Sequence, residues 1–113
     1  TIASLEYLNA FSNDGRKIFV FGDMLELGQF AKAQHQNIGS KCFDLNIDIV
    51  FTIGVETINV HSKIGDKIIN KHFDSKTDLI KSLKEIITKK DKILFKGSRG
   101  MKMEKIIEGV FET

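Results

Sequence analysis

The apolar residues of the chain follow two spacings, one typical of buried strands and one typical of amphipathic helices. Short apolar runs that stop abruptly at a glycine or a turn predict strands buried on both faces of a parallel sheet. Three such runs lie at residues 17–21, 48–53 and 92–95. Between them, apolar residues recur every three or four positions, which predicts helices. The predicted helices span residues 2–11, 29–46, 56–65, 76–89 and 101–111.

Two further segments complete the pattern. Residues 67–73 contain only a short apolar pair and Phe73, so we expect a loop with a minor strand there. Residues 75–78 read Ser-Lys-Thr-Asp, a capping box that marks the start of the helix over 76–89. Strands that alternate with helices, in a chain without proline, favour a parallel sheet covered by helices on both faces. We therefore predict a three-layer α/β fold with a mostly parallel sheet.

Composition narrows the class of protein without identifying it. The 113 residues fit one domain, and 42% hydrophobic with 28% charged residues is typical of a soluble globular protein. A net charge of +2, with lysines spread along the chain, does not indicate nucleic acid, and no apolar run approaches the roughly 18 residues of a membrane span. The single cysteine, Cys42, excludes an internal disulfide and suits the cytosol. Because Thr1 falls within a helical pattern, we expect a fragment of a longer chain.

Glycine and polar residues follow three of the predicted strands directly. They are Gly22-Asp23, Gly54 and the Gly97–Gly100 segment. If the strands are parallel, these loops share the edge of the sheet where α/β proteins bind ligands. Gly22 would let a ligand approach the backbone closely, and Asp23 would place a carboxylate in the crevice. Asp23 could equally be a cap for the turn that follows it.

The loop at residues 96–100, Lys-Gly-Ser-Arg-Gly, predicts an anion site. Lys96 and Arg99 flank the backbone amides of Gly97 and Ser98 at the start of a predicted helix, where the helix dipole and free N–H groups favour an anion. Ser98 could instead be only a helix cap, and the two cations could be only solvated. The chain contains neither the P-loop pattern G-x-x-x-x-G-K-[ST] nor G-x-G-x-x-G, so a phosphate-cradling loop and a dinucleotide site are disfavoured.

Glu26 and His35 are weaker candidates for the same site. Glu26 could reach the crevice or only favour the N-terminus of the next helix. His35 could face the crevice, although a partly exposed helical histidine is the more common situation. His61 and His72 are interpreted as surface or boundary residues. No spacing of metal ligands or of a nucleophile with its base is present, so we expect no metal site and no catalytic residue within this domain alone.

Two motifs together resemble the C-terminal domain of the bacterial Mur ligases. They are GDMLELG at residues 22–28, followed by His35 and Gly39, and KGSRGMKME at residues 96–104. The resemblance covers essentially the whole chain, residues 1–113. The motif GDMLELG resembles the corresponding motif in the branch of the family that adds D-alanyl-D-alanine. The resemblance implies a Rossmann-like third domain of a three-domain bacterial cytoplasmic enzyme of peptidoglycan synthesis, which serves cell wall formation, cell shape and division.

The resemblance also implies a reaction. ATP phosphorylates the carboxylate of UDP-N-acetylmuramoyl-tripeptide, and the amine of D-alanyl-D-alanine then attacks the acyl phosphate. In that family the central domain holds the P-loop and the Mg²⁺ ligands, and the N-terminal domain holds the UDP-sugar. The C-terminal domain closes over them, so that Gly22 and Asp23 would contact the nucleotide, while residues 96–99 would face phosphate or the dipeptide carboxylate. The chain on its own is expected to be inactive.

Two alternatives stay open at this point. One is another Mur-type ligase, such as the folate-adding relative, with a different amino acceptor. The other is a stand-alone α/β anion-binding module of the receiver or flavodoxin kind. A receiver needs acidic residues at the strand ends, and Gly54 at one such end argues against it.

Overall fold

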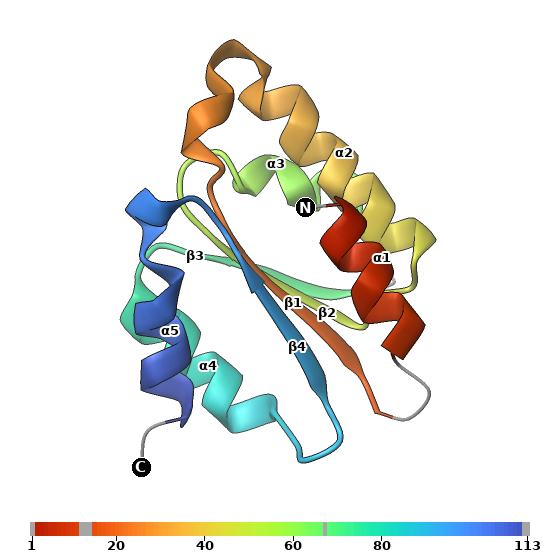
Figure 1. Cartoon of the computed structure of the whole chain (residues 1–113), viewed down its shortest axis with the longest axis vertical. Helices are drawn as coiled ribbons and strands as arrows, with labels where there is room; N and C mark the ends of the chain where they lie inside the picture. The colour runs from red at the N-terminus through yellow and green to blue at the C-terminus, as the bar shows by residue number, and fades with distance from the viewer. Residues whose placement is uncertain (1, 12–14, 67, 112–113) are drawn as a thin grey trace.

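The fold is a parallel sheet between two layers of helices, as Figure 1 shows in a computed structural model that describes residues 2–11, 15–66 and 68–111. Within these ranges the side chains of residues 11 and 25–27 are not described. The strands are β1 (Lys17–Gly22), β2 (Ile49–Ile53), β3 (Ile69–Phe73) and β4 (Lys92–Lys96). The helices are α1 (Ile2–Phe11), α2 (Ala31–Asp44), α3 (Ile58–His61), α4 (Lys76–Ile86) and α5 (Met103–Phe111), with short 3-10 helices η1 (Leu25–Phe30) and η2 (Arg99–Met101).

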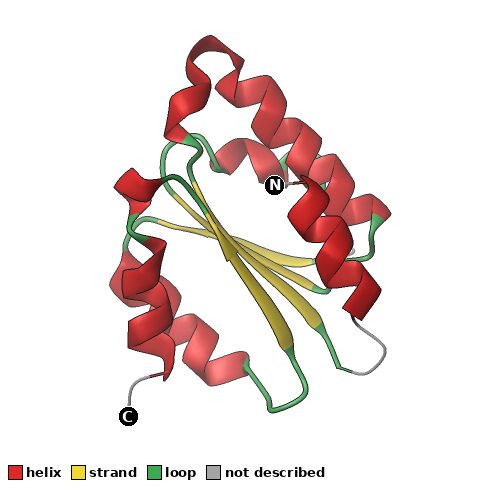
Figure 2. Ribbon diagram, viewed as in Figure 1, coloured by secondary structure: helices red, strands yellow, loops and turns green. Residues whose placement is uncertain are grey.

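The strands pair in the order β3-β2-β1-β4, and every pair is parallel. Figure 2 shows the sheet with helices on both sides, and this arrangement confirms the predicted three-layer α/β class. Alternate residues of β1 pack on opposite faces of the sheet. Phe19 and Phe21 pack in the core under α1, α2 and α3, whereas Ile18 and Val20 pack under α4 and α5. No helix in the described ranges is long and apolar enough to cross a membrane.

The segment 67–73 differs from the prediction of a loop with a minor strand. Residue 67 lies outside the described residues, but Ile69–Phe73 form a full edge strand, β3, paired with β2. As an edge strand, β3 exposes Ile69 and Lys71 and carries polar residues such as His72, so its hydrophobic signal is weak. The register between β3 and β2 matters for the site, because it places His72 beside Thr52 of β2.

The helix boundaries also depart from the predicted ranges, while the helix at 2–11 is confirmed. The helix predicted at 56–65 is a single turn, α3, and Gly65 beyond it has a φ of 72°. The helix predicted from residue 29 begins at Ala31, because η1 and a break at Gly28, with a φ of 55°, precede it. The helix predicted at 76–89 ends at Ile86, since Ile87 is already extended. Ser75 caps it as predicted, accepting a hydrogen bond from the Asp78 amide.

An ion pair between Arg16 and Asp91 joins the beginnings of the two adjacent strands β1 and β4. Arg16 Nη2 and Nε donate to the two carboxylate oxygens of Asp91 at 2.8 and 3.1 Å, and Nη2 also donates to the Ile86 carbonyl at 2.6 Å. The Thr88 amide donates to the same carboxylate at 2.8 Å. Since the Asp91 side chain is only 1% exposed, this bidentate pair fixes the end of α4 relative to the sheet.

The hydrogen bonds from Arg16 lower the pKa of Asp91 to about 2. A carboxylate with a lowered pKa stabilises the fold above its unfolded-state pKa of about 4 and loses that effect as pH falls toward 2. We therefore expect Asp91→Asn to lower the free energy of unfolding at pH 6 by about 1–2 kcal/mol, discounted for the solvent around Arg16, and to flatten its decrease between pH 4 and pH 2. Urea unfolding of the chain at several pH values measures both effects. Asp66→Asn, at an exposed carboxylate without a described partner, is the control; equal pH dependence in wild type and Asp91→Asn would contradict the assignment.

Candidate functional site

The loops after β1, β2 and β4 lie at one edge of the sheet, as the sequence predicts. The parallel register pairs Gly22 with Ile53 and Phe21 with Lys96, so these three strands end side by side. A backbone hydrogen bond of 3.0 Å from the Ser98 amide to the Asp23 carbonyl joins the loop after β4 to the loop after β1. This carboxyl edge is therefore a continuous surface made from segments far apart in the sequence.

The Asp23 carboxylate is buried at this edge and accepts hydrogen bonds from the loop after β2. Its oxygens receive the amides of Val55 at 2.8 Å, Glu56 at 3.0 Å and Thr57 at 2.8 Å. Asp23 is 3% exposed, and a Cβ on Gly54 would collide with its carboxyl group. The carboxylate thus caps the segment that enters α3, not the turn that follows Asp23, which corrects that alternative. A contact between Asp23 and a nucleotide stays a prediction.

The glycines at the ends of β1 and β4 lie where the backbone is crowded. A Cβ on Gly22 would lie 2.7 Å from Met103 Sδ, and a Cβ on Gly97 would lie 3.2 Å from the Gly22 Cα. The absence of side chains at both positions is therefore explained by the close approach of the two strand ends and of Met103. Contacts of Gly22 and Gly97 with a ligand stay predictions.

The loop at 96–100 leads into the 3-10 helix η2 and not directly into α5. Lys102, with a φ of 50°, interrupts the chain before α5 begins at Met103, so the predicted start of a helix at residue 101 is wrong. Ser98 precedes η2 as its cap residue, but its side chain makes no capping hydrogen bond. The Lys96 side chain is half-buried and Arg99 is exposed, and neither has an ion pair or side-chain hydrogen bond among the described residues. Both charges are available to an anion.

His35 is fully buried, so the alternative of a partly exposed helical histidine is wrong. Its Nδ1 lies 2.5 Å from the Ala31 carbonyl, and its Nε2 accepts the Met24 amide at 3.3 Å. The ring also packs on Phe21, with centroids 5.5 Å apart. His35 therefore stabilises the turn after β1 through its hydrogen bond with the Met24 amide. A direct contact between His35 and a ligand stays a prediction. The Glu26 side chain lies outside the described part of the chain.

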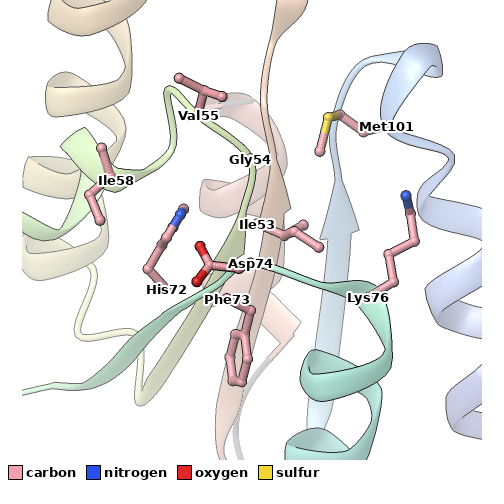
Figure 3. A pocket seen from close by; sticks show the side chains of 9 residues that line it. All are labelled: Ile53, Gly54, Val55, Ile58, His72, Phe73, Asp74, Lys76 and Met101. Carbon is pink, nitrogen blue, oxygen red and sulfur yellow. The ribbon is translucent and has the colours of Figure 1, made fainter.

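A pocket of about 560 Å³ opens at the ends of β2 and β3 (Figure 3). Its apolar part comes from the ends of both strands, from the start of α3 and from Met101, while its polar part is one imidazole, one carboxylate and one ammonium group. The lining residues are Ile53, Gly54, Val55, Ile58, His72, Phe73, Asp74, Lys76 and Met101. A pocket with opposite charges above an apolar floor suits a small molecule that carries both an ammonium and a carboxylate group.

His72, Asp74 and Lys76 are not among the site residues predicted from the sequence. His72 lies in β3, and Asp74 and Lys76 come shortly after it. Because β3 is a partly exposed edge strand, its residues do not show the apolar pattern that identifies a strand in the sequence. Once β3 is recognised as a strand, Asp74 directly after it matches the pattern of polar residues at strand ends that identifies Asp23. Among the described residues, no three His, Cys, Asp or Glu side chains are grouped so that they could hold a metal ion.

Removal of the Asp23 carboxylate should destabilise the chain even without any ligand. We expect Asp23→Ala to lower the free energy of unfolding by about 3 kcal/mol or more, because it leaves the amides of residues 55–57 without their acceptor. The stability of Asp23→Asn should lie between that of wild type and that of Asp23→Ala, because asparagine keeps one acceptor oxygen and has an NH2 donor in place of the other. Asp74→Ala, at an exposed carboxylate after β3, is the matched control and should change stability by less than about 0.5 kcal/mol. Urea unfolding decides this, and a fully stable Asp23→Ala variant would refute the role.

Known proteins are similar to this chain in sequence and in fold. Residues 1–99 match the family described as Mur ligase, glutamate ligase domain. The chain is 36% identical over 114 residues to UDP-N-acetylmuramoyl-tripeptide–D-alanyl-D-alanine ligase of Bacillus subtilis, covering 98% of this chain and 25% of the relative. It is 43% identical over 102 residues to the ligase of the same name from Buchnera aphidicola, covering 87% and 21%. The chain thus spans about a quarter or less of the length of these relatives.

Solved structures agree with the sequence comparison. The MurF ligase of Thermotoga maritima in complex with ADP superposes with a TM-score of 0.78 at 30% identity, covering 95% of this chain and 24% of that one. MurF from Acinetobacter baumannii superposes with a TM-score of 0.79 at 23% identity, covering 100% and 26%, which supports the fold. The family match over residues 1–99 and the shared fold agree with the two motifs at residues 22–28 and 96–104, and the chain belongs to the Mur ligase family.

Proposed function

We propose that this chain is the C-terminal domain of an ATP-dependent ligase of peptidoglycan synthesis. The ligase joins D-alanyl-D-alanine to UDP-N-acetylmuramoyl-tripeptide, the reaction named for relatives that are 36% and 43% identical to the chain. The enzyme acts in the bacterial cytoplasm, and its N-terminal and central domains complete the site. The isolated chain is then inactive, because it carries only part of that site.

The observation that carries this proposal is the carboxyl edge of the sheet. Lys96 and Arg99 lie at this edge without described partners, close to the end of β1, and a charged pocket opens beside them at the ends of β2 and β3. Two cations of this kind suit phosphate or carboxylate oxygens. The chain nevertheless has no P-loop to cradle a triphosphate. An anion-holding edge without a P-loop is half of a composite site.

The chain's own residues divide the substrates between two parts of this edge. Arg99 and Lys96, with the backbone of Gly97 and Ser98, hold phosphate oxygens. Residues 22–23 face the nucleotide. ATP and Mg²⁺ are held mainly by the central domain, and ADP in the Thermotoga maritima relative is consistent with nucleotide use.

The pocket at β2 and β3 receives the dipeptide. Asp74 attracts its ammonium group and Lys76 its carboxylate, while Ile53 and Phe73 contact its methyl groups. ATP supplies the phosphoryl group that activates the tripeptide carboxylate as an acyl phosphate, which the dipeptide amine then attacks. Closure of this domain orients the amine and excludes water, which would otherwise hydrolyse the activated carboxylate.

Arg99→Ala in the full-length ligase tests the role of the 96–100 loop. We expect kcat with ATP and D-alanyl-D-alanine to fall by about 10²–10³-fold, equivalent to about 2–4 kcal/mol, if Arg99 stabilises charge in the transition state. Steady-state kinetics with both substrates measures the loss. Lys105→Ala is the control, because Lys105 is exposed on α5 and, among the described residues, pairs only with Glu108, at 3.8 Å. Wild-type kinetics in Arg99→Ala would remove Arg99 from the site.

The amino acceptor is tested separately with the wild-type ligase. Because the family is described as a glutamate ligase domain, glutamate is the appropriate competitor of D-alanyl-D-alanine. Turnover with the dipeptide and none with glutamate supports the proposal, while the reverse supports the folate-adding type of ligase. Micromolar binding of a nucleotide by the isolated chain, measured by calorimetry, would favour a stand-alone binding module.

A further inference from the structure

Four polar side chains form a continuous hydrogen-bonded chain behind the pocket at β2 and β3. Thr52 Oγ1 lies 2.6 Å from His61 Nε2 and 2.8 Å from His72 Nδ1. His61 Nδ1 lies 2.8 Å from Asn70 Oδ1. Thr52 comes from β2, His72 and Asn70 from β3, and His61 from α3, so these hydrogen bonds join three elements. Thr52 is fully buried, and within the described part of the protein its hydroxyl is hydrogen-bonded only to the two rings.

The donor and acceptor in each of these hydrogen bonds can be assigned by starting from Asn70. The Asn70 amide group donates to the Ile68 carbonyl at 2.6 Å and to the Gly65 carbonyl at 3.1 Å, so its oxygen is the acceptor that faces His61. His61 Nδ1 must therefore carry a hydrogen. Burial and the neighbouring His72 lower the pKa of His61, which favours its neutral form. In a neutral ring with a hydrogen on Nδ1, Nε2 is a lone pair that accepts the Thr52 hydroxyl.

The tautomer of His72 follows from that assignment. Thr52 has donated its only hydrogen to His61, so its oxygen accepts a hydrogen from His72 Nδ1. A neutral His72 then has an unprotonated Nε2, and this nitrogen has no partner among the described residues. The His72 ring lines the pocket together with Asp74 (Figure 3). The hydrogen-bonded chain therefore presents a basic lone pair at the pocket.

We propose that His72 accepts the proton of the incoming dipeptide amine, and that Thr52, His61 and Asn70 position it by fixing its tautomer. This inference rests on the proposed function. At neutral pH the amine is an ammonium group without a lone pair, and it cannot attack a carbonyl carbon. His72 would be the catalytic residue of this chain, whereas the other three act only through it.

The proton and bond balance is simple. One proton passes from the ammonium group to His72 Nε2, which leaves a neutral amine and an imidazolium. The amine lone pair forms the C–N bond to the acyl phosphate carbon, and the C–O bond to phosphate breaks with its electrons on the phosphate. The second amine proton goes to the leaving phosphate, and His72 later returns its proton to water.

The charges around His72 come from three directions. The Asp74 carboxylate lies next to His72 in the pocket together with Lys76 at the start of α4, and the neutral His61 ring on α3 faces His72 with centroids 6.0 Å apart. On the other side, a second pocket that His72 also lines carries further charged groups of β3 and α4. These groups are Lys71, Asp78, Lys81 and Glu85. Both pockets therefore bring charges of both signs to His72.

The tautomer can be tested on the 113-residue chain without any substrate. Two-bond ¹H–¹⁵N correlation spectra at pH 7.5 should show His72 with a hydrogen on Nδ1 and none on Nε2. Thr52→Val, which removes the hydroxyl, should shift His72 toward the Nε2-protonated form, whereas Thr52→Ser should keep the wild-type pattern. An Nε2-protonated His72 in the wild-type chain would overturn the assignment.

The catalytic role is tested in the full-length ligase. We expect His72→Gln to lower kcat by about 10²-fold or more with little change in the KM for ATP. In wild type, kcat/KM for the dipeptide should rise with pH and level off as His72 loses its proton. In His72→Gln it should keep rising toward the pKa of the amine itself, about 8, so that high pH partly rescues the variant. Thr52→Val should lower kcat less, by about tenfold, and Lys32→Gln, at an exposed lysine of α2 away from the pocket, should keep both the rate and the profile.

The outcomes separate this inference from the proposed function. If the wild-type ligase does not use D-alanyl-D-alanine, the proposed function fails, whatever the tautomer of His72. If the wild type is active and a folded His72→Gln variant keeps its rate and pH profile, His72 is not the proton acceptor. Thermal unfolding of each variant verifies the fold, and Thr52→Val provides an independent measure should His72→Gln be unstable.

Discussion

The arrangement of the carboxyl edge depends on one buried charge, the carboxylate of Asp23. An ionised carboxylate removed from water costs several kcal/mol unless hydrogen bonds replace its hydration. Here the amides of residues 55–57 replace it, and the Asp23 carbonyl accepts the Ser98 amide in addition. One residue therefore connects the loops after β1, β2 and β4. The pocket and the cationic loop lie on this connected base and not on three independent loops.

The opposite ends of the strands are joined in a different way. There Arg16 and Asp91 form the link between β1 and β4, and the Lys92 amide donates to the Arg16 carbonyl at 2.9 Å. At the carboxyl edge, by contrast, Lys96 and Arg99 have no such partners among the described residues. Cations that are paired at one end of a sheet and unpaired at the other indicate where a ligand or another domain supplies the counter-charge. The two ends of the sheet therefore differ in whether the described residues neutralise their cations.

Much of the fold could be predicted from the sequence, because β1 and β2 are buried on both faces and their apolar runs are continuous. The edge strand β3 could not, since Asn70, Lys71 and His72 interrupt any apolar run there. The shared edge of Gly22, Gly54 and Gly97 followed from parallel pairing alone. The partners of Asp23 did not, because they are backbone amides 32 to 34 residues away and leave no trace in residue types. The same holds for His72, whose neighbour Thr52 is defined by register.

The way in which Asp23 holds the loop after β2 leaves the side chains of that loop unconstrained. Val55 is 81% exposed and Ile58 is 51% exposed, yet both line the pocket. Since the loop is held through its backbone N–H groups, almost any residue other than proline can stand at position 55 without loss of the Asp23 contacts. Substitutions at positions 55 and 58 can therefore reshape the pocket at little cost to folding. Such a loop lets the shape of the pocket change while the scaffold stays the same.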